Sequence, residues 1–154
     1  MAKETTYEEI ARELKNRIYK PVYYLMGEES YYIDLLTSEL QNSLLKPEER
    51  DFNLLTMFGA ETDVATVMNA ARGFPMGAQR LVVCVHEAAR LSNIEQLVLY
   101  LKKPQPSTVL IICYKYGRMD GRNKLINAIK QCGGVVFDSP KLKDYQMPAF
   151  IKRY

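Results

Sequence analysis

The 154-residue sequence contains no tryptophan, one histidine and three cysteines. The cysteines Cys84, Cys113 and Cys132 have no C-x-x-C spacing. Cys84 and Cys113 fall inside apolar runs, where they are interpreted as small buried hydrophobic side chains. A zinc site needs about four ligands, or three and a water, and one histidine with scattered cysteines does not supply them. No G-x-S-x-G motif supports a catalytic triad on His86. We therefore expect no catalytic residues and no metal.

Long apolar runs are also missing. No stretch approaches 18 uninterrupted apolar residues, so the sequence predicts no membrane span. The opening MAKETTYEEIARELK has acids and no apolar core, which excludes a signal peptide and favours a cytoplasmic location. The net charge is +3, with 21 basic residues interleaved among 18 acidic ones. This charge is too small and too dispersed to predict direct nucleic-acid binding.

What the chain does have is a regular alternation of apolar runs and helical patterns. Strands are expected over five runs: 22–26, 52–58, 81–85, 109–113 and 135–137. Helices are expected between them: 6–18, 30–45 capped by Ser30, 64–71 capped by Asp63, from Ser92 or Asn93 to about Leu101, and 122–131, with a further helix starting in DYQMPAFIKRY.

Strands that alternate with helices form β-α-β units, which build a parallel sheet with helices on both faces. The runs RLVVCV and TVLIIC are typical of strands buried on both faces. We therefore expect one α/β domain over residues 1–154, with three layers and a five-stranded parallel sheet. The apolar residues of AFIKRY need a surface to pack on, which suggests the N-terminal domain of a longer protein.

The turn after the first strand lacks a phosphate loop. A P-loop needs G-x-x-x-x-G-K-[ST], whose backbone N–H groups and lysine hold phosphates. Here MGEESYYIDLL keeps Gly27 but places Glu28 and Glu29 where phosphate oxygens would lie. These acids and Asp34 could bind a metal or act in acid–base catalysis, but acids that complement a helix dipole are the favoured interpretation. We expect no nucleotide cofactor.

The segment ARGFPMGAQRLVV places large apolar residues in a turn. Phe74 and Met76 flank Pro75, where Ser, Asn or Asp would be ordinary. Two interpretations are open: the pair folds back onto the core as a staple between helix and strand, or it is displayed to a partner. The residue pattern alone favours the staple.

Four motifs in order resemble the delta subunit of bacterial DNA polymerase III, a clamp-loader protein. They are PVYYLMGEESYYIDLL, GFPMGAQRLVVC, GRMDGRNKLINAIK and FDSPKLKDYQMPAFIKRY, and the resemblance covers residues 18–154. It implies an AAA+-type first domain without ATP binding, which binds the ring-shaped sliding clamp (beta) and opens it. It also implies lid and collar domains beyond Tyr154 that join the other loader subunits, indirect contact with DNA, and a non-catalytic, monomeric fragment.

The same resemblance implies a clamp-binding site. In the family, two large apolar residues at the end of the helix before the third strand enter a pocket on the clamp. Carried over, the pair is Phe74 and Met76 with Pro75 between them, although Met stands where the family has an aromatic residue. Gly73 and Gly77 would let the turn present them. Arg72 or Arg80 would add a contact at the rim.

Other polar and aromatic residues have two interpretations each. Asp120 and Arg122 either contact DNA or a neighbouring subunit, or cap and open a helix, and capping is favoured. Four tyrosines could stack on bases, but without a basic groove they are interpreted as core-edge residues: Tyr23, Tyr24, Tyr31 and Tyr32.

The alternative function is a nucleotide- or phosphate-utilising α/β enzyme with its site at the carboxyl ends of the strands. The polar groups and glycines available there are Gly27, Gly59, His86, Glu87, Tyr114, Lys115 and Asp138.

Overall fold

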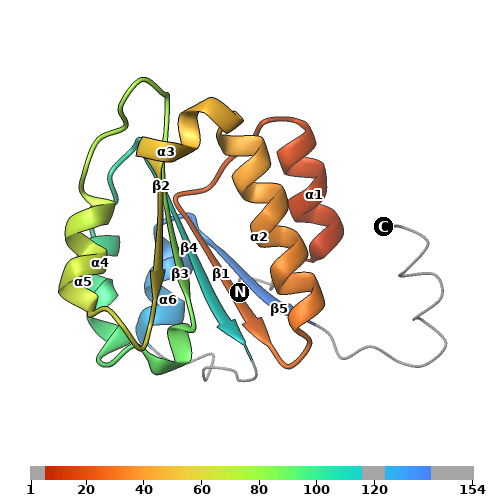
Figure 1. Cartoon of the computed structure of the whole chain (residues 1–154). Helices are drawn as coiled ribbons and strands as arrows, with labels where there is room; N and C mark the ends of the chain where they lie inside the picture. The colour runs from red at the N-terminus through yellow and green to blue at the C-terminus, as the bar shows by residue number, and fades with distance from the viewer. Residues whose placement is uncertain (1–5, 116–123, 140–154) are drawn as a thin grey trace, which may run out of the picture.

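A computed structural model describes residues 6–115 and 124–139 of the chain (Figure 1). Its helices are α1 (Tyr7–Lys15), α2 (Ser30–Leu44), α3 (Arg50–Asn53), α4 (Val64–Ala71), α5 (Val98–Leu101) and α6 (Lys124–Gln131). Its strands are β1 (Val22–Gly27), β2 (Leu54–Phe58), β3 (Leu81–His86), β4 (Thr108–Lys115) and β5 (Val135–Ser139). Short 3-10 turns lie at Pro47–Glu49, Ala88–Arg90 and Ile94–Leu97.

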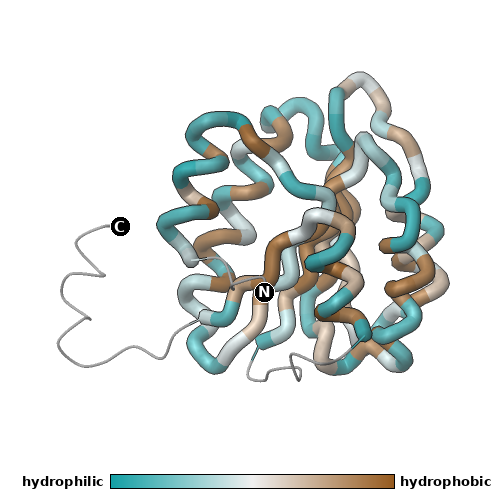
Figure 2. The backbone as a smooth tube through the Cα atoms, turned by 180° about the vertical axis from the view of Figure 1, so that it is seen from behind, coloured by the Kyte–Doolittle hydropathy of each residue, from teal (hydrophilic) through white to brown (hydrophobic). Residues whose placement is uncertain are grey.

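The five strands form one sheet in the order β2-β3-β4-β1-β5, and every neighbouring pair is parallel. Helices α1 and α2 cover one face, while α4, α5 and α6 cover the other (Figure 1). Figure 2 shows the hydrophobic strands running through the middle of the molecule between more hydrophilic outer segments. The expected three-layer α/β fold with five parallel strands is confirmed.

The core fills both sides of the sheet because side chains along a strand alternate between its faces. Tyr23 and Tyr24 are fully buried on opposite faces of β1. The Tyr23 hydroxyl accepts a hydrogen bond from the Lys20 backbone N–H at 2.9 Å, and burial raises the pKa of Tyr23 to about 12. These two tyrosines are core residues, as expected. Tyr31 and Tyr32 are half-buried on α2.

Two predicted elements have different bounds. The strand expected over 52–58 begins only at Leu54, because a helical turn that starts after Pro47 continues through Asn53. The helix expected over 6–18 ends at Lys15, since Arg17 adopts a left-handed φ of 58°. Ile18 is consequently 46% exposed and does not extend the buried stripe of Ile10 and Leu14.

Helix starts also differ from the expectation in two places. Ser30 is the first residue of α2, and the cap is Glu29, whose carboxylate accepts from the Tyr31 N–H at 2.9 Å. The helix expected over 92–101 is a 3-10 turn followed by the single turn of α5, because Asn93 has a left-handed φ of 58°. Asp120, Arg122 and the helix expected in DYQMPAFIKRY lie outside the described residues.

Within residues 6–115 and 124–139, no helix is both long enough and apolar enough to cross a membrane.

Candidate functional site

The turn that joins α4 to β3 lies where the parallel strands begin (Figure 1). Helix α4 starts at Asp63, whose carboxylate accepts from the Thr66 N–H at 2.8 Å, and it buries four side chains as predicted: Val64, Val67, Met68 and Ala71. Pro75 cannot continue a helix, because it lacks an N–H and its ring clashes with the preceding turn. The chain therefore leaves α4 at Arg72 and crosses to Leu81 through the turn.

The two large apolar side chains of this turn face solvent. Phe74 is 75% exposed and Met76 is 65% exposed, while Gly73 and Pro75 between and beside them are half-buried. The interpretation in which the pair folds back onto the core is wrong. The physical reason is the extended backbone, which turns Pro75 inward and its two neighbours outward.

The side chain of Asn53 fixes the turn from the neighbouring element α3. Its Nδ2 donates to the Met76 carbonyl at 2.8 Å and to the Glu49 carbonyl at 2.8 Å, while its Oδ1 accepts from the Met76 N–H at 2.6 Å. Asn53 is 1% exposed. The sequence reasoning missed this residue, because no local pattern links it to a turn 23 positions away.

The start of the turn is held from the opposite side. Gln105 Nε2 donates to the Arg72 carbonyl at 3.1 Å. The Tyr100 hydroxyl donates to the Ala71 carbonyl at 3.4 Å and accepts from the Gln105 N–H at 3.1 Å. At the other end Gly77 has a φ of +69°, a conformation that side-chain-bearing residues rarely adopt. The backbone that carries Phe74 and Met76 is thus tied at both ends.

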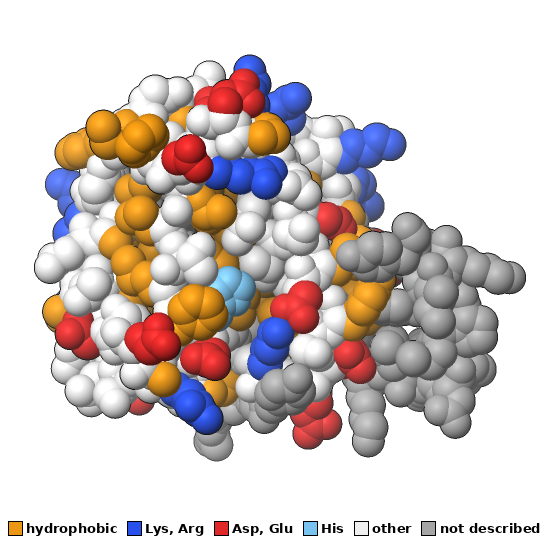
Figure 3. All heavy atoms as spheres, viewed as in Figure 1, with side chains coloured by type: hydrophobic (Ala, Val, Ile, Leu, Met, Phe, Trp, Pro, Cys, Tyr) orange, Lys and Arg blue, Asp and Glu red, His pale blue; other side chains and the backbone are white. Residues whose placement is uncertain are grey.

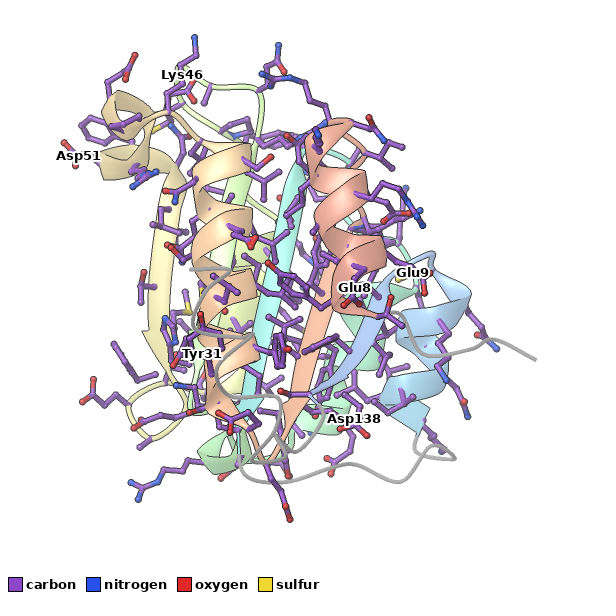
Figure 4. All side chains as sticks on the ribbon, turned by 90° about the vertical axis from the view of Figure 1, so that its right-hand side faces the viewer. Glu8, Glu9, Tyr31, Lys46, Asp51 and Asp138 are labelled. Carbon is purple, nitrogen blue, oxygen red and sulfur yellow. The ribbon has the colours of Figure 1, made fainter. Side chains whose placement is uncertain are left out.

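A third large apolar side chain projects from the element that holds the turn. Phe52 is 68% exposed and precedes Asn53 directly. We call Phe52, Phe74 and Met76 the apolar patch. Figure 3 shows hydrophobic side chains gathered at this end of the molecule, and in Figure 4 Lys46 and Asp51 extend into solvent there. Phe52 was assigned to a strand by its sequence, so its exposure was not foreseen.

The two arginines near the turn differ in their freedom. The Arg80 guanidinium lies over the Tyr19 ring, 4.6 Å from its centroid, and is therefore already engaged in a cation–π contact. Arg72 is exposed beside Phe74. Of the two rim residues considered from the sequence, Arg72 is the one that remains available for a partner.

The carboxyl ends of the strands hold the turn where a phosphate loop would lie. A Cβ on Gly27 would come within 2.8 Å of the Ser139 backbone, so this glycine is explained by the close approach of β5. The Glu29 carboxylate occupies the Tyr31 N–H, and Asp34 pairs with Lys115 at 2.7 Å. These contacts confirm the helix-terminal interpretation for Glu29 and leave that N–H closed to a phosphate.

A pocket of about 680 Å³ lies at the same edge, lined by Asp34, Phe58, His86, Glu87, Ala89, Arg90, Cys113 and Lys115. Gly59, another glycine of this edge, donates its N–H to the His86 carbonyl at 2.7 Å, and a Cβ there would lie 2.0 Å from the Glu87 carbonyl oxygen. Gly59 is therefore needed for backbone packing.

Two cysteines and the histidine converge beside this pocket. The side-chain ligand atoms of Cys84, His86 and Cys113 all lie within 4.8 Å of one another. The expectation that they would be scattered is wrong, because the parallel register brings β3 and β4 side by side. Hydrogen bonding to Cys84 lowers the pKa of Cys113, and the same bond raises that of Cys84. Both thiols are buried as predicted, whereas Cys132 is half-buried elsewhere.

This sheet order, with helices on both faces and a carboxylate in the phosphate turn, defines an AAA+-type α/β domain. Two solved structures share the fold at 16% identity. A DNA polymerase III gamma subunit-related protein of Thermotoga maritima matches with a TM-score of 0.61 over 92% of this chain and 48% of its own. The branch-migration protein RuvB of the same organism matches with a TM-score of 0.52 over 94% and 46%.

The sequence places the chain more narrowly. The pattern of the DNA polymerase III, delta subunit family matches residues 23–137, and the chain belongs to that family. The DNA polymerase III subunit delta of Bacillus subtilis is 28% identical over 133 residues, which are 80% of this chain and 38% of that protein. The solved clamp loader delta protein of Bacillus subtilis matches with a TM-score of 0.81 and 25% identity, over 94% of this chain and 45% of its own. The chain thus spans less than half the length of these relatives.

Proposed function

We propose that the chain is the clamp-binding domain of a cytoplasmic clamp loader. Phe74, Pro75 and Met76 enter an apolar pocket on the sliding clamp, Phe52 widens the contact, and Arg72 lies at its rim. The observation that carries the proposal is the exposure of Phe74 and Met76 on a turn whose backbone Asn53 fixes. Exposed apolar patches on soluble domains are typical of binding surfaces.

The energetics of this surface suit a binding anchor. Burying a Phe or Met side chain contributes about 1.5–3 kcal/mol. A few such side chains dominate most interfaces. Because the turn is already ordered, binding loses less conformational entropy than it would with a flexible loop. Met76 can adapt to an irregular pocket, since its side chain is unbranched and polarisable.

Opening of the ring needs no chemistry at the site. A domain that binds the open clamp more tightly than the closed clamp shifts the equilibrium by the difference in affinity. The other loader subunits and DNA then act with this domain through the parts of the family that extend beyond it. Release of clamp rings from circular DNA on addition of the chain measures this step.

The test of clamp binding is surface plasmon resonance against the sliding clamp of the same organism. The double variant Phe74→Ala, Met76→Ala should lose about 3 kcal/mol or more, which weakens the affinity at least about 100-fold. Its melting temperature should stay within about 2 °C of the parent, because both side chains are exposed.

Leu99→Ala is the matched control, since Leu99 is 54% exposed but lies on α5, outside the apolar patch. It should bind the clamp like the parent. The proposal fails if the parent does not bind at tens of micromolar, or if the double variant binds as well as the control.

A further inference from the structure

The convergence of Cys84, His86 and Cys113 has a simple geometric origin. Strands β3 and β4 are parallel neighbours in which Cys84 is level with Ile111. Side chains two residues apart point to the same face of a strand, so Cys84 and His86 share a face with Cys113. This face is covered by α2, and the Cys84 Sγ and His86 Nε2 atoms are 3.5 Å apart.

Surrounding side chains orient the three groups. The Phe58 ring stacks on the His86 ring, with centroids 5.3 Å apart and an interplanar angle of 26°. On the other side the Thr37 hydroxyl lies 3.2 Å from the Cys113 Sγ atom. Contacts of this kind around a ligand set fix its orientation before a metal arrives.

We propose that Cys84, His86 and Cys113 bind one thiophilic divalent cation, for which Zn²⁺ is the probe. Two thiolates and an imidazole are a ligand set that zinc accepts, with Zn–S distances of about 2.3 Å and Zn–N distances of about 2.1 Å. Those lengths place tetrahedral ligands about 3.5 Å apart, which the sulfur–nitrogen separation of Cys84 and His86 matches. The fourth position faces the pocket at the ends of the strands and takes a water.

The charges at the site are compatible with a cation. Binding releases the thiol protons to solvent, and the two resulting thiolates balance the charge of Zn²⁺. The nearest fixed cation is Lys115, which Asp34 already pairs at 2.7 Å. Figure 3 shows the only histidine, in pale blue, with basic and acidic side chains close by at the molecular surface. The metal therefore enters from the pocket, whose wall includes His86 and Cys113.

The experiment uses the whole chain, reduced and stripped of metal, in isothermal titration with Zn²⁺. We expect one saturable Zn²⁺ per chain and a higher melting temperature when zinc is present. Cys84→Ser and Cys113→Ser should lose this binding, and His86→Gln should weaken it. Cys132→Ser is the matched control and should bind like the parent, because the Cys132 thiol donates to the Ile129 carbonyl on α6.

A second measurement does not depend on how the variants fold. Co²⁺ bound to the parent chain should show a thiolate-to-metal charge-transfer band in the near ultraviolet, which the Cys132→Ser variant retains. Absence of saturable Zn²⁺ binding, a Co²⁺ spectrum without that band, or binding that survives in folded Cys113→Ser would each overturn the proposal.

Discussion

Replacing Asn53 tests whether the turn is held rigid for binding. Asn53 makes three hydrogen bonds from a buried amide, two of them to the Met76 backbone. Removing one partner of a buried hydrogen bond costs about 1–3 kcal/mol per group left unpaired. Water can reach part of the turn, so Asn53→Ala should cost about 2 kcal/mol. For a domain of this size that lowers the melting temperature by about 4–8 °C.

Binding should fall as well, although Asn53 itself is buried and cannot touch a partner. Without the amide, Phe74 and Met76 sample more conformations, and ordering them again reduces the affinity. Calorimetry and surface plasmon resonance against the clamp measure the two effects. Asn42→Ala is the matched control, since Asn42 is exposed and its side chain accepts only an exposed contact from Arg50.

Asn53→Asp separates hydrogen bonding from packing. The carboxylate keeps the size of the amide and can still accept from the Met76 N–H, but it cannot donate to the Met76 and Glu49 carbonyls. We expect it to be about as destabilising as Asn53→Ala. The reasoning is refuted if either Asn53 variant melts and binds like Asn42→Ala.

Two further predictions concern stability. Gly27→Ala should destabilise by about 1–3 kcal/mol from its φ of +124° and further from the 2.8 Å approach to Ser139, whereas Gly133→Ala at φ +87° meets no atom within 4 Å and should show only the first effect in urea unfolding. Hydrogen bonding to Thr66 lowers the pKa of Asp63, so its stabilisation is complete above its unfolded pKa of about 3.9 and is lost as pH falls through the lower folded pKa. Asp63→Asn should flatten that part of the urea-unfolding profile, and an unchanged profile would contradict the assignment.

The sheet was predictable because its central strands are continuous apolar runs. LVVCV and VLIIC are buried on both faces, and only a parallel sheet between helices does that. Segments shorter than two helical turns were predicted less well. Residues 50–53 and 94–101 have too few positions for a period to emerge, and caps with a left-handed φ, such as Asn93, decided their form.

The apolar patch was predictable in part. Phe74 and Met76 stood out because the composition of their turn is unusual, but exposure depends on tertiary hydrogen bonds that local sequence does not contain. Asn53 and Gln105 reach the turn from positions 23 and 33 residues away. Phe52 lies inside a run that alternates like a strand, so its position beside the turn followed only from the fold.

The thiol–imidazole cluster shows the same limit. The spacing of Cys84 and His86 places them on one face of a strand, and that much could be read from the sequence. Cys113 joins them only because β4 lies beside β3 in the observed register. The sheet order, which skips between distant segments, is the information that the sequence pattern lacked.

The turn divides its residues between holding and binding. Asn53 and Gln105 act on backbone atoms, so they constrain the path of the chain whatever side chains it carries. Phe74 and Met76 make no stabilising contribution to the core because they are exposed. A change of contact residue can therefore alter affinity without loosening the fold, while a change of holding residue alters both. This separation explains how a turn can tolerate two exposed apolar side chains and still present them in one arrangement.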